Sequence, residues 1–180
     1  MSGFGELANR LRAAINFVAA SRESEAVRIA SDTLALVQDR IIQTGKNSDG
    51  NKLPGYSKTQ IPKSSFYNKS RNGGADARVR KAKKTLSYSE FRELNNLQSG
   101  HVDLYFTGEI WRGTGVIVEK RLLRSTRVII GGRTPESSNK IDWNSARYGG
   151  SILEPSAKEL QQVRQAWRDA RIKELRRIFG

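Results

Sequence analysis

Near its C-terminus the chain reads Asn144-Ser-Ala-Arg-Tyr-Gly-Gly-Ser-Ile-Leu-Glu-Pro-Ser-Ala157. The paired glycines and Pro155 favour a turn, because glycine permits positive φ and proline cannot continue a helix. Ser156 and Glu159 then have the spacing of a capping box, in which each side chain accepts a hydrogen bond from a free backbone N–H. Apolar residues follow at helical spacing, namely Leu160, Val163, Trp167, Ala170 and Ile178. The stretch therefore predicts a short strand or a turn that leads into a terminal helix ending at Phe179.

The first 44 residues carry two apolar faces that do not line up along one straight helix. The first face comprises Phe4, Leu7, Leu11, Ile15 and Val18, and the second comprises Val27, Ala30, Leu34, Val37 and Ile41. At about 100° per residue the two faces differ by roughly 120°. The change falls between Ala19 and Glu25, where Ser21 or Ser24 is able to cap a new helix. We expect a short helix, a break or bend, and a longer helix to about Thr44, ended by Gly45.

Residues 45–100 hold most of the excess of positive over negative charge. They contain twelve Lys or Arg against four Asp or Glu, in a chain whose net charge is +14. Such an excess attracts polyanions, so nucleic acid or an acidic protein surface is the expected partner. The run from Lys69 to Lys84 has little to bury, which predicts a long basic loop that is mobile until it meets its partner. The candidate contact residues are Lys69, Arg71, Arg78, Arg80, Lys81, Lys83 and Lys84.

Aromatic residues flank the basic run, and two roles are open to them. The four are Tyr56, Phe66, Tyr67 and Tyr88. They either stack on nucleic-acid bases or anchor the loop to the body of the protein. After them, Ser87 and Glu90 have capping-box spacing and predict a short helix.

Residues 101–150 have the patterns of β-strands. Alternation over 102–106 and β-branched runs at 116–118 and 127–130 predict three strands of an antiparallel sheet, the last closed by Gly131-Gly132. Together the segments predict a single α+β domain. N-terminal helices (1–44) and a C-terminal helix (151–180) pack on a small antiparallel sheet (101–150), and the long basic loop with its short helix lies between them (45–100).

The residues that catalysis usually needs are scarce. The chain has no cysteine and one histidine, His101, which we expect at the surface. Asn47, Asp49 and Asn51 alternate like a calcium loop but lack its further carboxylates. Gly108 and Gly113 have phosphate-loop spacing, but Thr114 and Gly115 stand where that loop needs Lys and Ser/Thr.

We therefore expect no enzyme, no cofactor and no metal, and a small hydrolase that uses His101 is only a minor alternative. The sequence has neither a secretory leader nor an apolar run of about 20 residues, so we expect synthesis in the cytoplasm and no membrane contact.

Several short motifs in chain order resemble one protein family. Leu104-Tyr-Phe-Thr-Gly-Glu-Ile-Trp111 is similar to a Leu-Thr-Gly-x-Leu signature, and a predicted hairpin, Tyr148-Gly149 and Leu153-Glu-Pro-Ser156 follow it. The loop that contains Asp49-Gly50 and Tyr56-Ser57 is similar to one found in some members. These features resemble the neck and tail-completion proteins of tailed bacteriophages, a group that includes virion morphogenesis and minor tail proteins. Arg147-Tyr-Gly-Gly150 stands where members usually have Glu-Phe-Gly-Thr, which leaves the position in the neck or tail open.

The resemblance implies a structural virion protein and a homo-oligomeric ring. Such a ring would sit at the head–tail joint, contact portal or connector and tail proteins, surround the DNA path and touch packaged DNA without sequence preference. Its location would be the virion, and the host cytoplasm during assembly. Trp111, Trp143 and Trp167 are candidate subunit-interface anchors. The competing hypothesis is an autonomous basic nucleic-acid-binding protein.

Overall fold

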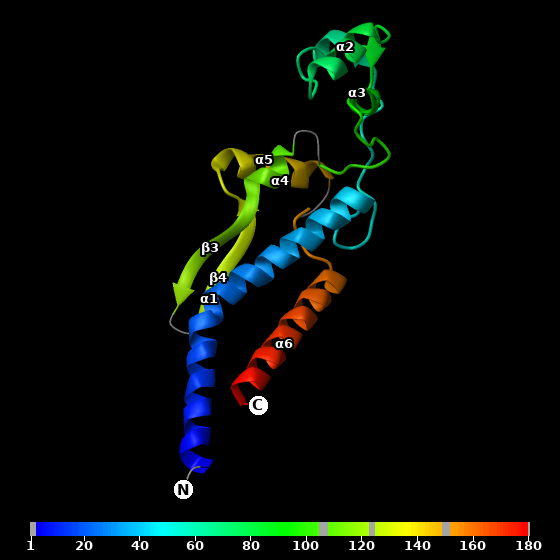
Figure 1. Ribbon diagram of the computed structural model, residues 1–180. Coiled ribbons are helices and arrows are strands. Elements are labelled where there is room, and N and C mark those ends of the chain that lie inside the picture. Colours follow the sequence, from blue (N-terminus) through cyan, green and yellow to red (C-terminus); the bar gives the residue numbers. More distant parts are fainter. Residues whose placement is uncertain (1–2, 105–107, 123–124, 149–151, 180) are drawn as a thin grey trace.

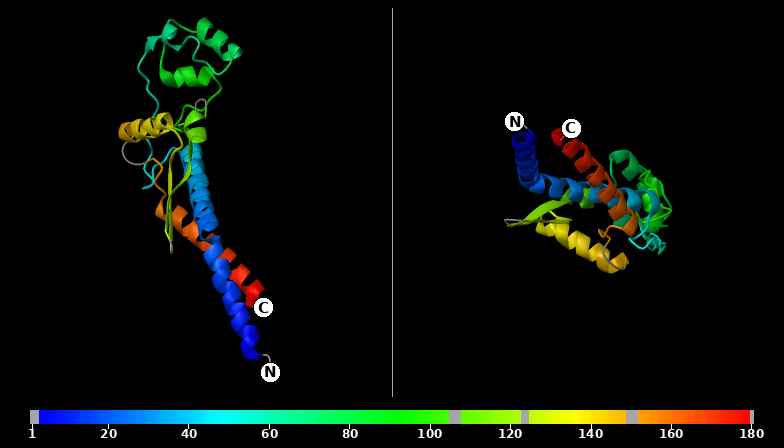
Figure 2. Two further views of the ribbon diagram at one scale, coloured as in Figure 1. Left: turned by 90° about the vertical axis from the view of Figure 1, so that its left-hand side faces the viewer. Right: turned by 90° about the horizontal axis from the view of Figure 1, so that it is seen from below.

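The computed structural model describes residues 3–104, 108–122, 125–148 and 152–179 (Figure 1). The described residues form six α-helices, one short 3-10 helix and two antiparallel sheets of two strands each. The chain thus has an α+β fold, as the sequence predicted. Its shape is elongated, with the outer ends of α1 and α6 at one end and residues 61–94 at the other (Figure 2).

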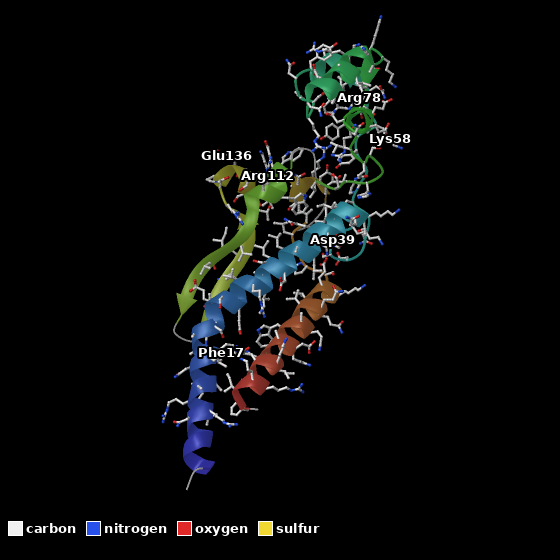
Figure 3. The ribbon with its side chains drawn as sticks, in the orientation of Figure 1. Phe17, Asp39, Lys58, Arg78, Arg112 and Glu136 are labelled. Carbon is white, nitrogen blue, oxygen red and sulfur yellow. The ribbon has the colours of Figure 1, made fainter. Side chains whose placement is uncertain are left out.

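Helix α1 (Gly3–Thr44) is continuous, so the predicted second helix with its own serine cap is wrong. The predicted bend is present: the axis changes direction where the α1 label stands in Figure 1, close to the Phe17 that Figure 3 labels. Ser24 Oγ donates to the carbonyl of Ser21 at 2.9 Å. A serine that bonds back to the preceding turn bends a helix without ending it. Beyond Thr44 the chain turns at Gly45, whose φ is +60°.

Strands β3 (Thr114–Leu122) and β4 (Ser125–Gly132) form the predicted antiparallel hairpin, with Val116 opposite Ile130. One face of this hairpin packs on α1. The strand predicted at 102–106 does not form over residues 102–104, and residues 105–106 lie outside the described part. Val102, Asp103 and Leu104 are all buried, and Leu104 has a φ of +55°. Three buried neighbours cannot follow the one-face-in, one-face-out alternation of a half-buried strand.

Residues 101–150, predicted to form the sheet, also contain two helices, α4 (Glu109–Gly113) and α5 (Pro135–Tyr148). Neither helix was predicted from the sequence. The start of α5 has a local signal: Thr134 N–H donates to Ser137 Oγ at 2.9 Å, and Ser137 N–H donates to Thr134 Oγ1 at 3.2 Å. Pro135 then occupies the first turn, where its missing N–H leaves no intrahelical bond unmade. Helix α5 packs on β4 and α4.

Helix α6 (Ala157–Phe179) begins with the predicted capping box. Ser156 N–H donates to Glu159 Oε2 at 2.6 Å, and Glu159 N–H donates to Ser156 Oγ at 3.2 Å. The same carboxylate accepts a 2.9 Å hydrogen bond from Arg40 on α1. At the far end, Arg10 of α1 donates to the carbonyl of Phe179 at 2.5 Å. These contacts fix α6 antiparallel to α1, so α6 packs on α1 and α1 in turn packs on the hairpin.

Two clusters of buried side chains stabilise the chain. The main core joins α1, α4, α5 and the segments beside them through Val37, Ile41, Leu53, Val102, Leu104, Trp111, Ile141, Ile152 and Leu153. The second cluster consists of Phe66, Val79, Leu86 and Phe91. It lies within residues 61–94, which we call the basic lobe.

The basic lobe corrects the prediction of a long loop. Its elements are β1 (Ile61–Pro62), a 3-10 helix η1 (Lys63–Phe66), α2 (Gly73–Lys81), β2 (Thr85–Leu86) and α3 (Tyr88–Leu94). The capping box of α3 is present as predicted, between Ser87 and Glu90. The run from Lys69 to Lys84 is largely the helix α2 and its flanks, because Ala75 and Val79 of this run are buried.

Candidate functional site

The aromatic side chains of the basic lobe pack against other side chains of the same chain. The rings of Phe66 and Phe91 stack with centroids 4.4 Å apart, and both are buried. Arg80 covers the ring of Tyr67 at 4.5 Å from its centroid. Tyr88 packs edge-on against Tyr56 at 5.5 Å. Of the two roles left open by the sequence, these contacts favour anchoring over stacking on bases.

The three carboxylates of the basic lobe are bonded within the chain. Asp76 accepts a 2.7 Å hydrogen bond from Arg80, which lowers the pKa of Asp76. Glu90 pairs with Lys83 at 2.5 Å, and this bond, with those from Ser87 and Gln60, lowers the pKa of Glu90 to about 2. Glu93 accepts from Ser99 Oγ at 2.7 Å. Each of the three acids is therefore bonded to a group of the same chain.

The seven predicted contact residues fall into two groups. Lys69, Lys81 and Lys84 are exposed, and their side chains make no hydrogen bond or ion pair with any residue that the structure describes. The other four make hydrogen bonds or ion pairs within the chain. Arg80 and Lys83 pair with the carboxylates of Asp76 and Glu90. Arg78 Nε donates to the Leu94 carbonyl at 2.7 Å, and the backbone N–H of Arg71 donates to Asn95 Oδ1. The basic surface thus consists of three free lysines among arginines that also hold the lobe together.

A buried ion pair at the joint between the basic lobe and the body was missed from the sequence. Arg92 Nη2 donates to both carboxylate oxygens of Asp103, at 3.0 and 2.8 Å, and the two residues are 1% and 4% exposed. Tyr56 Oη donates to Asp103 at 2.6 Å, and the Arg92 guanidinium lies 4.2 Å from the centroid of the Tyr56 ring. Burial, followed by this hydrogen bond, raises the pKa of Tyr56. Since Tyr56 precedes the lobe and Asp103 follows it, the network fastens both connecting segments together.

His101 has a structural role in place of the predicted surface position. It is half-buried, and its Nε2–H donates to the carbonyl of Ile42 at 2.9 Å. That carbonyl is one of the last four of α1, which have no partner within the helix. The side chain also packs against Gly45, where an added Cβ would lie 2.6 Å from the His101 Cβ. His101 therefore caps the C-terminal end of α1 and holds the turn at Gly45 in place.

The described residues offer no gathered set of metal ligands: no group of three or more His, Asp or Glu side chains lies close enough together. In the turn that was compared with a calcium loop, Asn47 Oδ1 accepts from the backbone N–H groups of Asp49 and Asn51 at 3.1 and 2.9 Å. The side chain that a cation would need is thus bonded to its own loop. Gly108 has a φ of +76° and begins the short helix α4.

The three tryptophans lie in different environments. Trp111 is buried in the main core, where its side chain packs within the chain. Trp167 lies on α6 near Glu25 of α1. Trp143 on α5 is 60% exposed, with the Arg147 guanidinium 5.2 Å from its ring centroid. It borders a cleft of about 690 Å³ between α5 and the joint, lined mainly by Tyr56, Ile61, Phe66, Tyr88, Ile110 and Tyr148.

An apolar stripe on the outer half of α1 is uncovered. Leu11 and Ile15 are 53% and 59% exposed, whereas Ala14, one helix face away, is buried. Figure 2 shows that this half of α1 extends past the hairpin and is accompanied only by the end of α6. Within the described part of the chain, helix α6 covers one side of α1 and leaves the stripe exposed.

None of the described helices combines the length and apolar character of a membrane span. No protein-family model matches this chain, and comparisons with curated proteins and with solved structures found no match.

Proposed function

We propose that this chain is a structural virion protein of a tailed phage that forms an oligomeric ring at the head–tail joint. In that position it would link the connector to the tail, surround the DNA path and act without catalysis. The location in a virion rests on the sequence resemblance. The assembly into a ring is supported by the uncovered stripe of Leu11 and Ile15 on α1.

The stripe supports self-association for a physical reason. Burying a leucine or isoleucine side chain stabilises a complex by about 1.5–3 kcal/mol relative to leaving it in water. Leu11 and Ile15 lie one turn apart on a helix that extends away from the body, where a neighbouring subunit has access. A head-to-tail contact between one patch on each subunit and a different patch on the next closes into a ring when the rotation permits. Trp143 on α5 is a second exposed apolar group and is a candidate for the complementary patch.

The experiment compares the mass of the purified chain with that of two matched variants. Ile15→Glu places a charge in the stripe, and Ala13→Glu places the same charge on the opposite, exposed side of the same helix. We expect an oligomer for the original chain and for Ala13→Glu by light scattering after gel filtration, and a shift to monomer for Ile15→Glu. Helix content from circular dichroism should be equal in all three, because neither position is buried.

A monomeric original chain over the whole concentration range would overturn the ring. Negative-stain images of the oligomer give its symmetry, and an antibody against a C-terminal tag locates the chain in virions. Label found anywhere other than the neck or tail would overturn the virion placement.

The second candidate is an autonomous nucleic-acid-binding protein, favoured by the excess of cations in the basic lobe. It predicts a monomer that binds duplex DNA tightly and in a strongly salt-dependent way. The mass measurement separates it from the ring.

A further inference from the structure

We propose that the basic lobe binds the phosphate backbone of duplex DNA and does not read or stack on its bases. The inference deepens the proposed function, on which its place in a virion rests, by naming the part of the subunit that faces DNA. Its physical basis is independent of that placement and lies in the charges and contacts of residues 61–94.

The first step is the charge that the lobe leaves uncompensated. Residues 61–94 hold nine Lys or Arg and three Asp or Glu. All three acids are bonded within the chain, and Arg92, the most buried of the cations, pairs with Asp103 outside the lobe. Lys69, Lys81 and Lys84 are exposed, with no bonded partner among the described residues. A surface that neutralises its own acids and still presents free lysines has an electrostatic attraction for a polyanion.

The second step is the scaffold that presents these lysines. Asn72 Oδ1 accepts from the Ala75 N–H at 2.9 Å at the start of α2. At its other end, Lys63 Nζ donates to the carbonyls of Arg80 and Ala82 at 2.5 and 2.9 Å. Ala75 and Val79 bury the inner side of the helix. Lys81 lies about 200° round the helix from Val79, and so on the outer side. Lys81 is thus held by a folded helix, and Lys69 and Lys84 lie in the short segments that flank this helix, so the three lysines need little ordering when they meet phosphate.

The third step concerns the kind of nucleic acid. Proteins that bind single strands combine a basic groove with aromatic rings on which bases stack. In the basic lobe the rings of Phe66 and Phe91 stack on each other, and Arg80 covers Tyr67. Because these rings already pack against other side chains, the basic lobe binds nucleic acid through the electrostatic attraction between lysine and phosphate. Duplex DNA has one negative charge per about 1.7 Å of its axis, the denser target for such attraction.

The fourth step is access. The lobe lies at the end of the molecule opposite to the outer ends of α1 and α6, and Figure 3 shows Arg78 at that end (Figures 2 and 3). The stripe proposed for subunit contact lies on α1, far from the lobe. A subunit held in a ring through α1 therefore still presents its basic lobe to DNA.

The test measures the affinity of the full chain for a fluorescent duplex of mixed sequence as a function of salt. The lobe variant carries Lys69→Gln, Lys81→Gln and Lys84→Gln. The matched control carries Lys158→Gln, Arg164→Gln and Lys173→Gln on α6, three exposed cations without a bonded partner among the described residues. Both variants lose three positive charges. All six positions are exposed, so melting temperatures close to that of the original chain are expected and are checked first.

We expect the lobe variant to lower the slope of log affinity against log salt by about 2.7, or 0.9 for each lost phosphate contact, and the control to change it by less than about 1. Affinity at about 0.1 M salt should fall more than tenfold in the lobe variant alone. A single strand of the same length should bind more weakly than the duplex, and duplexes of different sequence should bind alike.

Equal losses in the two variants would overturn the inference, because general charge would then explain the binding. Tighter binding of the single strand, or of polyglutamate, would also overturn it and identify bases or an acidic protein as the partner. The oligomer mass of the same samples is measured separately. A monomer that binds DNA through the lobe contradicts the ring alone, and an oligomer that ignores DNA contradicts this inference alone.

Discussion

Replacing Asp103 by Asn tests the buried joint between the basic lobe and the body. The change keeps the shape of the side chain and removes its charge. It removes the negative charge that lies 2.8 Å from Nη2 of the Arg92 guanidinium, which is 1% exposed. It also weakens the acceptor of the 2.6 Å hydrogen bond from Tyr56.

The expected loss is large because a charge is left uncompensated inside the protein. Removing one partner of a buried ion pair reduces the free energy of unfolding by about 3–5 kcal/mol, whereas an exposed pair contributes about 0–1 kcal/mol. The side chains of this pair are both buried, and two hydrogen bonds join them. We therefore expect Asp103→Asn to lower the free energy of unfolding by the amount typical of a buried pair, about 3–5 kcal/mol. Removing both charges, with Arg92→Met added to Asp103→Asn, should restore part of the loss, because the buried cation is gone.

The assay is urea unfolding followed by circular dichroism at one fixed protein concentration, since self-association adds to apparent stability. A loss below about 1 kcal/mol for Asp103→Asn would refute the reasoning, because it is the value of a solvated pair. A double variant that is less stable than Asp103→Asn would also refute it, since it would mean that the charge of Arg92 is not the source of the cost.

Two further predictions concern a carboxylate and a glycine. The pKa of Glu90 falls from 4.5 to about 2 on folding, so its contribution to stability is complete above pH 4.5 and is lost as pH falls through 2. The melting temperature of Glu90→Gln should therefore lie below that of the original chain at pH 6, and the two should converge near pH 2. Glu154→Gln, at an exposed position, is the control, and a difference that persists at pH 2 would contradict the assignment. At the end of β4 an added Cβ on Gly132 would lie 2.3 Å from the Ser138 nitrogen, whereas one on Gly131 would meet nothing within 4 Å. Gly132→Ala should lower the free energy of unfolding by roughly 1–3 kcal/mol and Gly131→Ala by much less, and equal losses in urea titrations would show that the contact with α5 is not the cause.

Features that depend on neighbouring residues could be predicted from the sequence. The capping boxes at Ser87 and Ser156 each need only two side chains three positions apart, and both are present. The hairpin of β3 and β4 follows from two β-branched runs joined by a short connection. The bend in α1 was visible as a change of apolar face, although the sequence could not show that Ser24 would bond inside a continuous helix.

Features that depend on contacts between residues far apart in the chain could not be predicted from the sequence. The basic run has almost nothing to bury within itself, and it folds because Val79 meets Phe66, Leu86 and Phe91 in one cluster. Arg92 reads as a surface residue of a short helix until Asp103 and Tyr56 are brought around it. Helix α5 was missed because its cap uses Thr134 and Ser137 without the acidic residue of a capping box.

By itself, the sequence determined where α3 and α6 begin, where the hairpin lies and that the chain is strongly basic, because capping boxes, strand patterns and charge are local properties. Only the tertiary structure decided which charges are free. Each cation of the basic lobe looks alike in the sequence, but Arg92 is buried against Asp103, Arg80 and Lys83 hold carboxylates, and Lys69 stays exposed. The physical reason is that a charge is compensated by whatever lies within a few ångströms of it, and folding alone sets those neighbours.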